Sequence, residues 1–125
     1  MAIDLHVHTT ASDGTLSPAD VVQYAKTRGL EAIAVTDHDT VEGLDEAVAE
    51  GSTTGFEVVP GVEISADYAE GAFHLLGYYL DFKSSALLSR LAVLQDARAE
   101  RNPKIARKLQ ALGFSISFAE VEQEA

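Results

Sequence analysis

Residues 4–14, with the sequence DLHVHTTASDG, are typical of a β-strand that ends at a turn. A strand sends residues i and i+2 to the same face, so His6 and His8 are expected to point the same way. Asp13 follows in the turn and can fold back beside them. One histidine on a strand is more often a core residue than a ligand, but two imidazoles and a carboxylate together suit a divalent metal ion. The spacing therefore predicts a metal site at the end of this strand.

Segments typical of helices and strands alternate after this stretch. Ser17 is the expected N-cap of a first helix, with Pro18 at its first position and Gly29 at its end. Thr40 is the expected cap of a second helix, which should end at Gly51. The four expected strands cover residues 2–8, 31–36, 56–65 and 73–80.

The last third of the chain has a helical pattern. A helix is expected to start at residues 84–85, with leucines repeating along one side. Asn102 followed by Pro103 resembles a cap and a first helical position, so we expect a new helix there that stops at Gly113. One more helix is expected to begin within residues 118–124.

The alternation of strands and helices favours an α/β fold with parallel strands and crossover helices. In such folds the functional residues gather at the carboxyl ends of the strands. Four residues that can bind metals fall at or just past such ends: His8, Asp13, His38 and Glu63. Their positions support a metal site independently of their chemistry.

The composition limits the classes of protein to which the chain can belong. Its 125 residues, 46% hydrophobic and 23% charged, suit one folded domain or part of one. The net charge of −11 argues against strong nonspecific nucleic-acid binding, because phosphate contacts need Lys and Arg. Cysteine is absent, so a metal ion must be held by imidazole and carboxylate. No segment is typical of a signal peptide or a membrane span, so we expect a cytoplasmic protein without membrane partners.

Five motifs together resemble the PHP (polymerase and histidinol phosphatase) family. In order, they are His6-x-His8, Asp13-Gly14, Thr36-Asp37-His38-Asp39, Gly61-Val62-Glu63-Ile64-Ser65 and His74-Leu75-Leu76-Gly77-Tyr78. The resemblance is to the stand-alone metal-dependent phosphoesterases of the family and runs from residue 3 to about residue 118. It implies a distorted, seven-stranded relative of the (β/α) barrel, of which this chain would supply about four mainly parallel strands. It also implies up to three divalent metal ions. Manganese or zinc suits these ligands best, and iron and magnesium are compatible.

The resemblance assigns a role to each residue that can bind a metal. The implied ligands are His6 and His8 for the first metal, Glu63 as the bridge between the first and second, His74 for the second, and Asp13 and His38 for the third. Through a metal-activated hydroxide, Asp13, His38 and Glu63 would take part in catalysis. Judged from the residues alone, Glu63 could equally pair with an arginine and His74 could be a core histidine.

Three further residues are expected to support the site. Asp37 and Asp39 flank His38, and we expect one of them to orient an imidazole and the other to cap the following helix. Arg101 lies where the family's helical insertion begins and could bind a substrate phosphate, since guanidinium binds phosphate bidentately. The alternative for Arg101 is a solvated helix face.

The resemblance covers only part of the family's fold. Residues 1–83 would form the N-terminal part of the metal-binding barrel, and residues 84–125 the start of the helical insertion. The family takes further ligands from later strands, and all four histidines of this chain are already assigned. Four strands also leave an unpaired sheet edge. Either the chain is a fragment of a longer protein, or self-association completes the sheet.

The leading functional prediction is hydrolysis of a phosphate monoester in a small phosphorylated substrate, either a nucleotide or the end of an oligonucleotide. The alternative is a structural or regulatory metal-binding module without turnover. A metal hydrolase acting on carbon centres, similar to the amidohydrolases, is a third reading. It is disfavoured because no lysine lies in an expected strand to bridge two metals.

Overall fold

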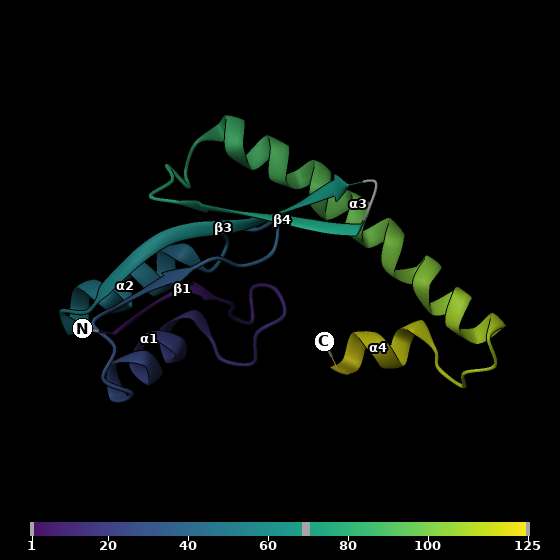
Figure 1. The fold of residues 1–125 in the computed structure, drawn as a ribbon, viewed down its shortest axis with the longest axis horizontal. Helices are drawn as coiled ribbons and strands as arrows, with labels where there is room; N and C mark the ends of the chain where they lie inside the picture. The colour runs from purple at the N-terminus through teal and green to yellow at the C-terminus, as the bar shows by residue number, and fades with distance from the viewer. Residues whose placement is uncertain (1, 69–70, 125) are drawn as a thin grey trace.

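The computed structural model describes residues 2–68 and 71–124 (Figure 1). Its elements, in chain order, are β1 (Ile3–Val7), α1 (Pro18–Thr27), β2 (Ala32–Val35), α2 (Leu44–Thr54), β3 (Glu57–Tyr68), β4 (Gly71–Tyr78), α3 (Ser85–Ala111) and α4 (Phe118–Glu124). The predicted α/β alternation is confirmed, and each of the four strands overlaps its predicted range.

The four strands form one curled sheet in the order β1-β2-β3-β4 (Figure 1). The pairs β1–β2 and β2–β3 are parallel, whereas β3–β4 is antiparallel, so the prediction of mainly parallel strands is confirmed. The pairing of β3 changes part-way along the strand. Pro60 is the last residue paired with β2, in parallel, and Gly61 is the first paired with β4, in antiparallel orientation. A Cβ at Gly61 would lie 2.7 Å from the Thr36 Cγ2 atom and 2.9 Å from the Gly77 carbonyl oxygen, so this junction needs glycine.

Helix α1 begins as the sequence predicts. The Ser17 hydroxyl accepts a hydrogen bond from the Asp20 backbone N–H at 3.1 Å and donates one to Asp20 Oδ2 at 2.7 Å. Pro18 occupies the first turn, and Gly29, with φ of 77°, follows the last one. These signals fix where the helix begins and ends. Val22, on the side of the helix that faces the sheet, is completely buried.

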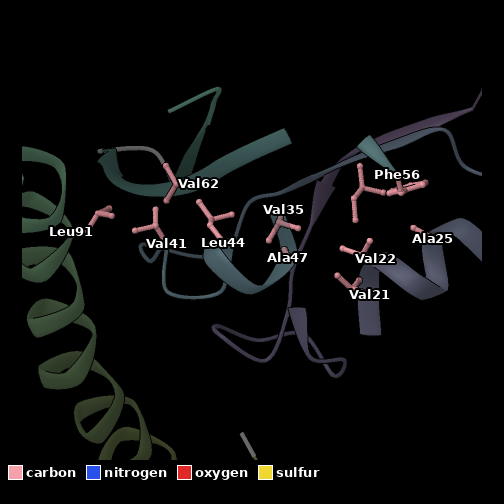
Figure 2. Close-up of a cluster of buried hydrophobic side chains, with 11 residues drawn as sticks. Val21, Val22, Ala25, Val35, Val41, Leu44, Ala47, Phe56, Val62 and Leu91 are labelled. Atoms are coloured by element: carbon pink, nitrogen blue, oxygen red, sulfur yellow. The ribbon is translucent and has the colours of Figure 1, made fainter. Parts of the chain in front are cut away.

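The hydrophobic core lies between the sheet and helices α1 and α2 (Figure 2). All four residues of β2 are buried, whereas β1, at the edge of the sheet, is largely exposed. Leu91 brings α3 against the other end of this core, beside Val41 and Val62 (Figure 2). The ends of the parallel strands are therefore held by packing from three helices.

Helix α2 starts later than predicted. It begins at Leu44, and its N-cap is Gly43, which makes no side-chain capping hydrogen bond. The predictions that Thr40 caps this helix, and that Asp37 or Asp39 does so, are therefore wrong. The physical reason is that residues 37–39 are bonded to neighbouring strands and loops, so the chain needs a further turn before the helix can start.

Helix α2 also ends later than predicted. It continues past Gly51 to Thr54, and Gly55, with φ of 65°, ends it. Gly51 serves packing instead, because a Cβ there would lie 2.6 Å from Val58 Cγ2 on β3. A glycine can thus mark close contact between a helix and a sheet as well as the end of a helix.

Helix α3 is continuous, so the predicted break at Asn102–Pro103 is wrong. Pro103 lies inside the helix and cannot donate to the carbonyl four residues earlier. The neighbouring segments are rich in Ala, Arg, Lys and Leu, which favour helix. The helix therefore continues although one backbone hydrogen bond is missing at Pro103. Gly113, with φ of 93°, follows the end of α3 as predicted, and α4 forms where expected. Among the described helices, none combines the length and the apolar character that crossing a bilayer requires.

Candidate metal centre

The predicted ligands come together where the parallel strands end. His6 lies in β1 and His8 follows it, His38 follows β2, and Glu63 lies in β3 beside His38. The fourth histidine, His74, comes from β4, which pairs with this part of β3. Residues from four strands thus share one site.

Glu63 is the centre of this cluster, and its side chain is only 4% exposed. Its two oxygens are approached by all four imidazoles: Oε2 lies 2.9 Å from His6 Nε2, 2.8 Å from His8 Nε2 and 3.4 Å from His38 Nδ1, and Oε1 lies 2.6 Å from His74 Nδ1. In the described part of the chain, Glu63 forms no ion pair with a lysine or an arginine. A carboxylate surrounded by imidazoles is the arrangement of a metal ligand rather than of a structural salt bridge.

Asp13 joins the cluster from the turn after β1. Its Oδ1 lies 2.6 Å from His8 Nδ1, and its Oδ2 lies 3.6 Å from His38 Nε2. The turn closes through a hydrogen bond of 2.9 Å from the Gly14 N–H to the Thr9 carbonyl. A Cβ at Gly14 would collide with the His8 carbonyl group, so glycine lets the turn bring Asp13 back over His8.

The ligand atoms form three overlapping groups, and within each group all of them lie within 4.8 Å of one another. The groups are His6, His8 and Glu63; His8, Asp13 and His38; and His38, Glu63 and His74. The ring centroids of successive histidines along the cluster are 4.7 to 5.0 Å apart. Each group could hold a metal ion, and because the groups share residues, their ions would be neighbours.

Two buried nitrogen atoms without hydrogen-bond partners give separate support for metal binding. His8 Nε2 and His38 Nδ1 are buried and have no hydrogen-bond partner. His8 Nε2 approaches Glu63 Oε2 to 2.8 Å, but not in the direction of a hydrogen bond. Buried polar atoms without partners are rare in folded proteins because they cost free energy. Bound cations could satisfy these nitrogen lone pairs, so these residues fit divalent metals.

Burial and hydrogen bonding act in opposite directions on the pKa of Glu63. Burial raises this pKa, but hydrogen bonds with His6 and His74, together with the charge that His38 carries when it is protonated, outweigh burial and hold the pKa below its ordinary value. For His38, burial is the largest effect and lowers the pKa, although Glu63 and Asp13 act to raise it. Both directions favour a charged carboxylate and a neutral imidazole, which are the states that bind metals.

Asp37 supports the loop after β1. It accepts hydrogen bonds from the Thr9 N–H at 2.7 Å, from the Thr9 hydroxyl at 2.8 Å and from the Ser12 hydroxyl at 2.5 Å. Both oxygens of this buried carboxylate are therefore occupied by the loop that carries Asp13.

Asp39 forms a second buried network next to His38. Its Oδ1 accepts a hydrogen bond from the Ser65 N–H at 2.8 Å, and its Oδ2 accepts one from Arg98 Nε at 2.5 Å. Arg98 also donates to the Ser65 hydroxyl at 2.8 Å, and Gln95 donates to the Asp39 carbonyl at 3.0 Å. We call Asp39, Ser65, Gln95 and Arg98 the Asp39 clasp, because they join α3 to the loop after β2 and to β3.

In the Asp39 clasp, groups of the protein itself donate hydrogen bonds to the buried carboxylate. Burial raises the pKa of Asp39, but the hydrogen bonds from Ser65 and Arg98 outweigh burial and lower it. Among the described residues, neither Asp37 nor Asp39 makes a hydrogen bond to an imidazole. Sequence reasoning missed Arg98 altogether, because its partner Asp39 lies 59 positions away and no local pattern connects them.

A cleft of about 390 Å³ opens beside His38 and Asp13. Helix α3 forms one of its walls with Gln95, Arg98 and Asn102. Arg101, the arginine predicted to bind a substrate phosphate, is not among the residues that line the cleft. It is exposed on α3, with Nη2 3.5 Å from Asn102 Oδ1.

The curled, mainly parallel sheet forms a half-barrel, and the imidazole and carboxylate groups at its strand ends could hold metal ions. The model of the PHP domain family matches residues 4–118. The chain therefore belongs to the PHP domain family, as its motifs suggest.

Relatives of this chain are longer proteins. A 5'-3' exoribonuclease from Haemophilus influenzae is 37% identical over 92% of this chain and 42% of its own length. A 3',5'-nucleoside bisphosphate phosphatase from Chromobacterium violaceum is 35% identical over 93% of this chain and 41% of its own length. The solved structure of a candidate metal-dependent phosphoesterase from Bifidobacterium adolescentis matches with a TM-score of 0.87 and 32% identity, over 97% of this chain and 42% of the other. The chain thus spans about two fifths of the length of these relatives.

Proposed function

We propose that this chain carries the metal centre of a phosphoesterase that hydrolyses a phosphate monoester, in a nucleotide or at the end of an oligonucleotide. The observation that carries the proposal is the set of three overlapping ligand groups, two of which share Glu63, beside an open cleft. The names of the relatives, an exoribonuclease and a bisphosphate phosphatase, support phosphate-ester hydrolysis as the reaction.

Divalent ions, when bound, would supply Lewis acidity toward the phosphoryl group and toward a water molecule. The residues would hold these ions in place: Glu63 as the shared carboxylate, and His8 and His38 through nitrogen atoms that lack other partners. Asp13 has a side chain that is 62% exposed and lies at the cleft, so it can meet both an ion and the substrate. We propose up to three ions, because there are three groups, with manganese or zinc preferred by imidazole and carboxylate.

Other parts of the chain have proposed roles as well. Residues 1–83 would act as the metal-binding part and residues 84–125 as the helical wall of the substrate site. Arg101 remains a proposed phosphate contact, because it lies one helical turn from Arg98 at the cleft. Self-association through the exposed edge strand β1 is a further proposal, since unpaired strand edges readily pair with other chains.

Hydrolysis of p-nitrophenyl phosphate with and without manganese tests the proposed function. His38→Ala and Asp13→Asn should each remove the metal-dependent activity, because both residues belong to the same ligand group. Asp45→Asn is the matched control for Asp13→Asn, since its carboxylate is similarly exposed, at 70% against 62%, and lies in an ion pair with Lys83 instead. Activity that survives both substitutions would contradict the proposal.

A metal-binding module without turnover is the second candidate. It is favoured by the exposure of two ligands, His6 at 50% and His74 at 41%, which leaves one side of the centre open. Tight manganese binding in calorimetry, combined with no hydrolysis of any phosphate monoester, would favour the module over the enzyme.

A further inference from the structure

Positive charge in this acidic chain is concentrated in one segment. Residues 98–108, RAERNPKIARK, contain five of the nine basic residues and one acidic residue, whereas the other 114 residues contain four basic and nineteen acidic residues. This segment is the second half of helix α3, which extends beyond the sheet (Figure 1). The chain as a whole is therefore negatively charged, whereas this segment is positively charged.

The basic residues form a row on the helix. Arg98, Arg101, Lys104 and Arg107 are spaced three residues apart, and Lys108 lies beside Lys104. On an α-helix, residues three and four apart are neighbours on the surface. Each step of three residues falls about 60° short of a full turn, so these side chains form a connected band about 15 Å long that winds around the helix. We call these five residues the basic row.

The basic row begins at the cleft. Arg98 lines the cleft beside Asp13 and His38, and it is held there by Asp39. The remaining four residues of the row are exposed and lead away from the metal centre along α3. The row and the cleft therefore form one continuous surface.

Four of the five charges of the row are available to a ligand, whereas the guanidinium of Arg98 is paired with Asp39. Lys104 lies 3.6 Å from Glu100, but both side chains are more than 60% exposed, so this ion pair is weak. Within the described residues, Arg107 and Lys108 form no ion pair with an acidic side chain. Ala106, on another side of the helix, is buried, so packing of α3 leaves the four exposed residues of the row facing solvent.

We propose that the basic row binds the phosphates of a single-stranded oligonucleotide whose end lies in the cleft. Phosphate contacts by Lys and Arg supply most of the affinity of such surfaces, and a line of charges that starts at the metal centre follows the backbone away from the reacting end. This inference rests on the proposed function and deepens it, because it makes oligonucleotides, rather than mononucleotides, the preferred substrate class.

Binding can be measured without turnover. The probe is a short, fluorescent, 5'-phosphorylated single-stranded RNA, and its anisotropy is followed in EDTA over a range of salt concentrations. We compare Lys104→Gln/Arg107→Gln/Lys108→Gln with the control Lys26→Gln/Arg28→Gln/Arg90→Gln. The two triple variants lose the same net charge, and glutamine preserves helix propensity. None of the six residues lines the cleft or belongs to the metal centre.

The basic-row variant should bind the RNA between tenfold and a hundredfold more weakly, and its salt slope should be shallower by about 2, since each single-strand phosphate contact contributes about 0.7. The control variant should retain the affinity and the slope of the wild type. Hydrolysis of p-nitrophenyl phosphate should stay within about twofold in both variants, since a small monoester does not reach the row.

Equal losses in the two triple variants would overturn the proposal, because net charge rather than the row would then control binding. Binding of anionic phosphatidylserine vesicles without binding of RNA would also overturn it and would assign the row to a membrane surface. RNA binding that depends on the row in a chain without phosphatase activity would uphold this inference and reject only the proposed function.

Discussion

Two buried carboxylates beside His38, Glu63 and Asp39, have different surroundings. The Glu63 side chain is 4% exposed and that of Asp39 is 0% exposed, so both are removed from water. Asp39 faces the permanent cation of Arg98 and a backbone N–H group. Glu63 faces four imidazoles, which carry a charge only when they are protonated.

This difference shows which of the two regions is suited to a bound ion. A buried charge is tolerated when it is paired and hydrogen-bonded. The Asp39 clasp meets that condition with protein groups alone, whereas the centre around Glu63 leaves two buried nitrogen atoms without partners. The clasp is therefore complete as it stands, and the centre is suited to cations.

Glu63→Gln should have the largest effect of the changes that test this comparison. The amide keeps the shape of the side chain but removes the charge common to two ligand groups. We expect manganese affinity to fall by about 100-fold or more, with loss of metal-dependent hydrolysis. Titration calorimetry and p-nitrophenyl phosphate hydrolysis measure the two losses. Asp39→Asn makes the same chemical change in the clasp. An equal loss of manganese affinity in this variant would contradict the view that only the centre around Glu63 binds the ions.

Metal binding should stabilise the fold through the centre and not through the clasp. Manganese at about 100 times its Kd should add about 2.7 kcal/mol to the unfolding free energy, because the ions bind only the folded chain. The Tm should rise by roughly 10 °C relative to the protein in EDTA, measured by scanning calorimetry. Asp39→Asn should keep this rise, and Glu63→Gln should lose most of it. A full rise in Glu63→Gln would place the ions elsewhere.

Asp39→Asn should lower stability even without metal. Asparagine tolerates the φ of 55° at this position and can still accept the Ser65 N–H, but it leaves Arg98 without its anionic partner. We expect a loss of about 2 kcal/mol, measured by urea unfolding in EDTA. Asp45→Asn, which breaks an exposed ion pair with Lys83, should cost less than about 0.5 kcal/mol. Similar costs for the two variants would show that the clasp contributes no more than a surface pair.

The smallest effect concerns pH. The pKa of Asp39 is lowered in the folded chain, so its stabilising contribution is complete above the ordinary aspartate pKa of about 4 and is lost as the pH falls through the lower folded value. The stability difference between wild type and Asp39→Asn, in EDTA, should therefore be constant at about pH 5 and above. It should shrink at about pH 3. A difference of the same size at both pH values would mean that the charge of Asp39 does not act in the clasp.

The parts of the fold that could be predicted depend on local signals. The cap at Ser17 acts through a residue three positions away, and the buried run of β2 is read from its side chains alone. The predictions that were wrong, at Thr40, Gly51 and Asn102–Pro103, used equally local signals that other contacts overrode. Gly51, for example, is explained by its contact with Val58 on a strand and not by helix termination.

The candidate site was partly predictable for a similar reason. The spacing of His6 and His8 places both at one strand end, and the structure brings Asp13, His38, Glu63 and His74 to the same place. The roles of the two aspartates around His38 could not be read from their positions, because each depends on a partner in another element. The cleft was equally hidden, since α3 supplies one wall from residues distant in the chain.

The sequence by itself determined the α/β alternation, the family and the kinds of ligand available, since these follow from residue type and short spacings. The tertiary structure alone decided that Glu63 lies among four imidazoles while Asp39 meets Arg98, and that the basic row starts at the cleft. The physical reason is that burial and pairing depend on which distant segments pack together, and no short pattern in the chain records that choice.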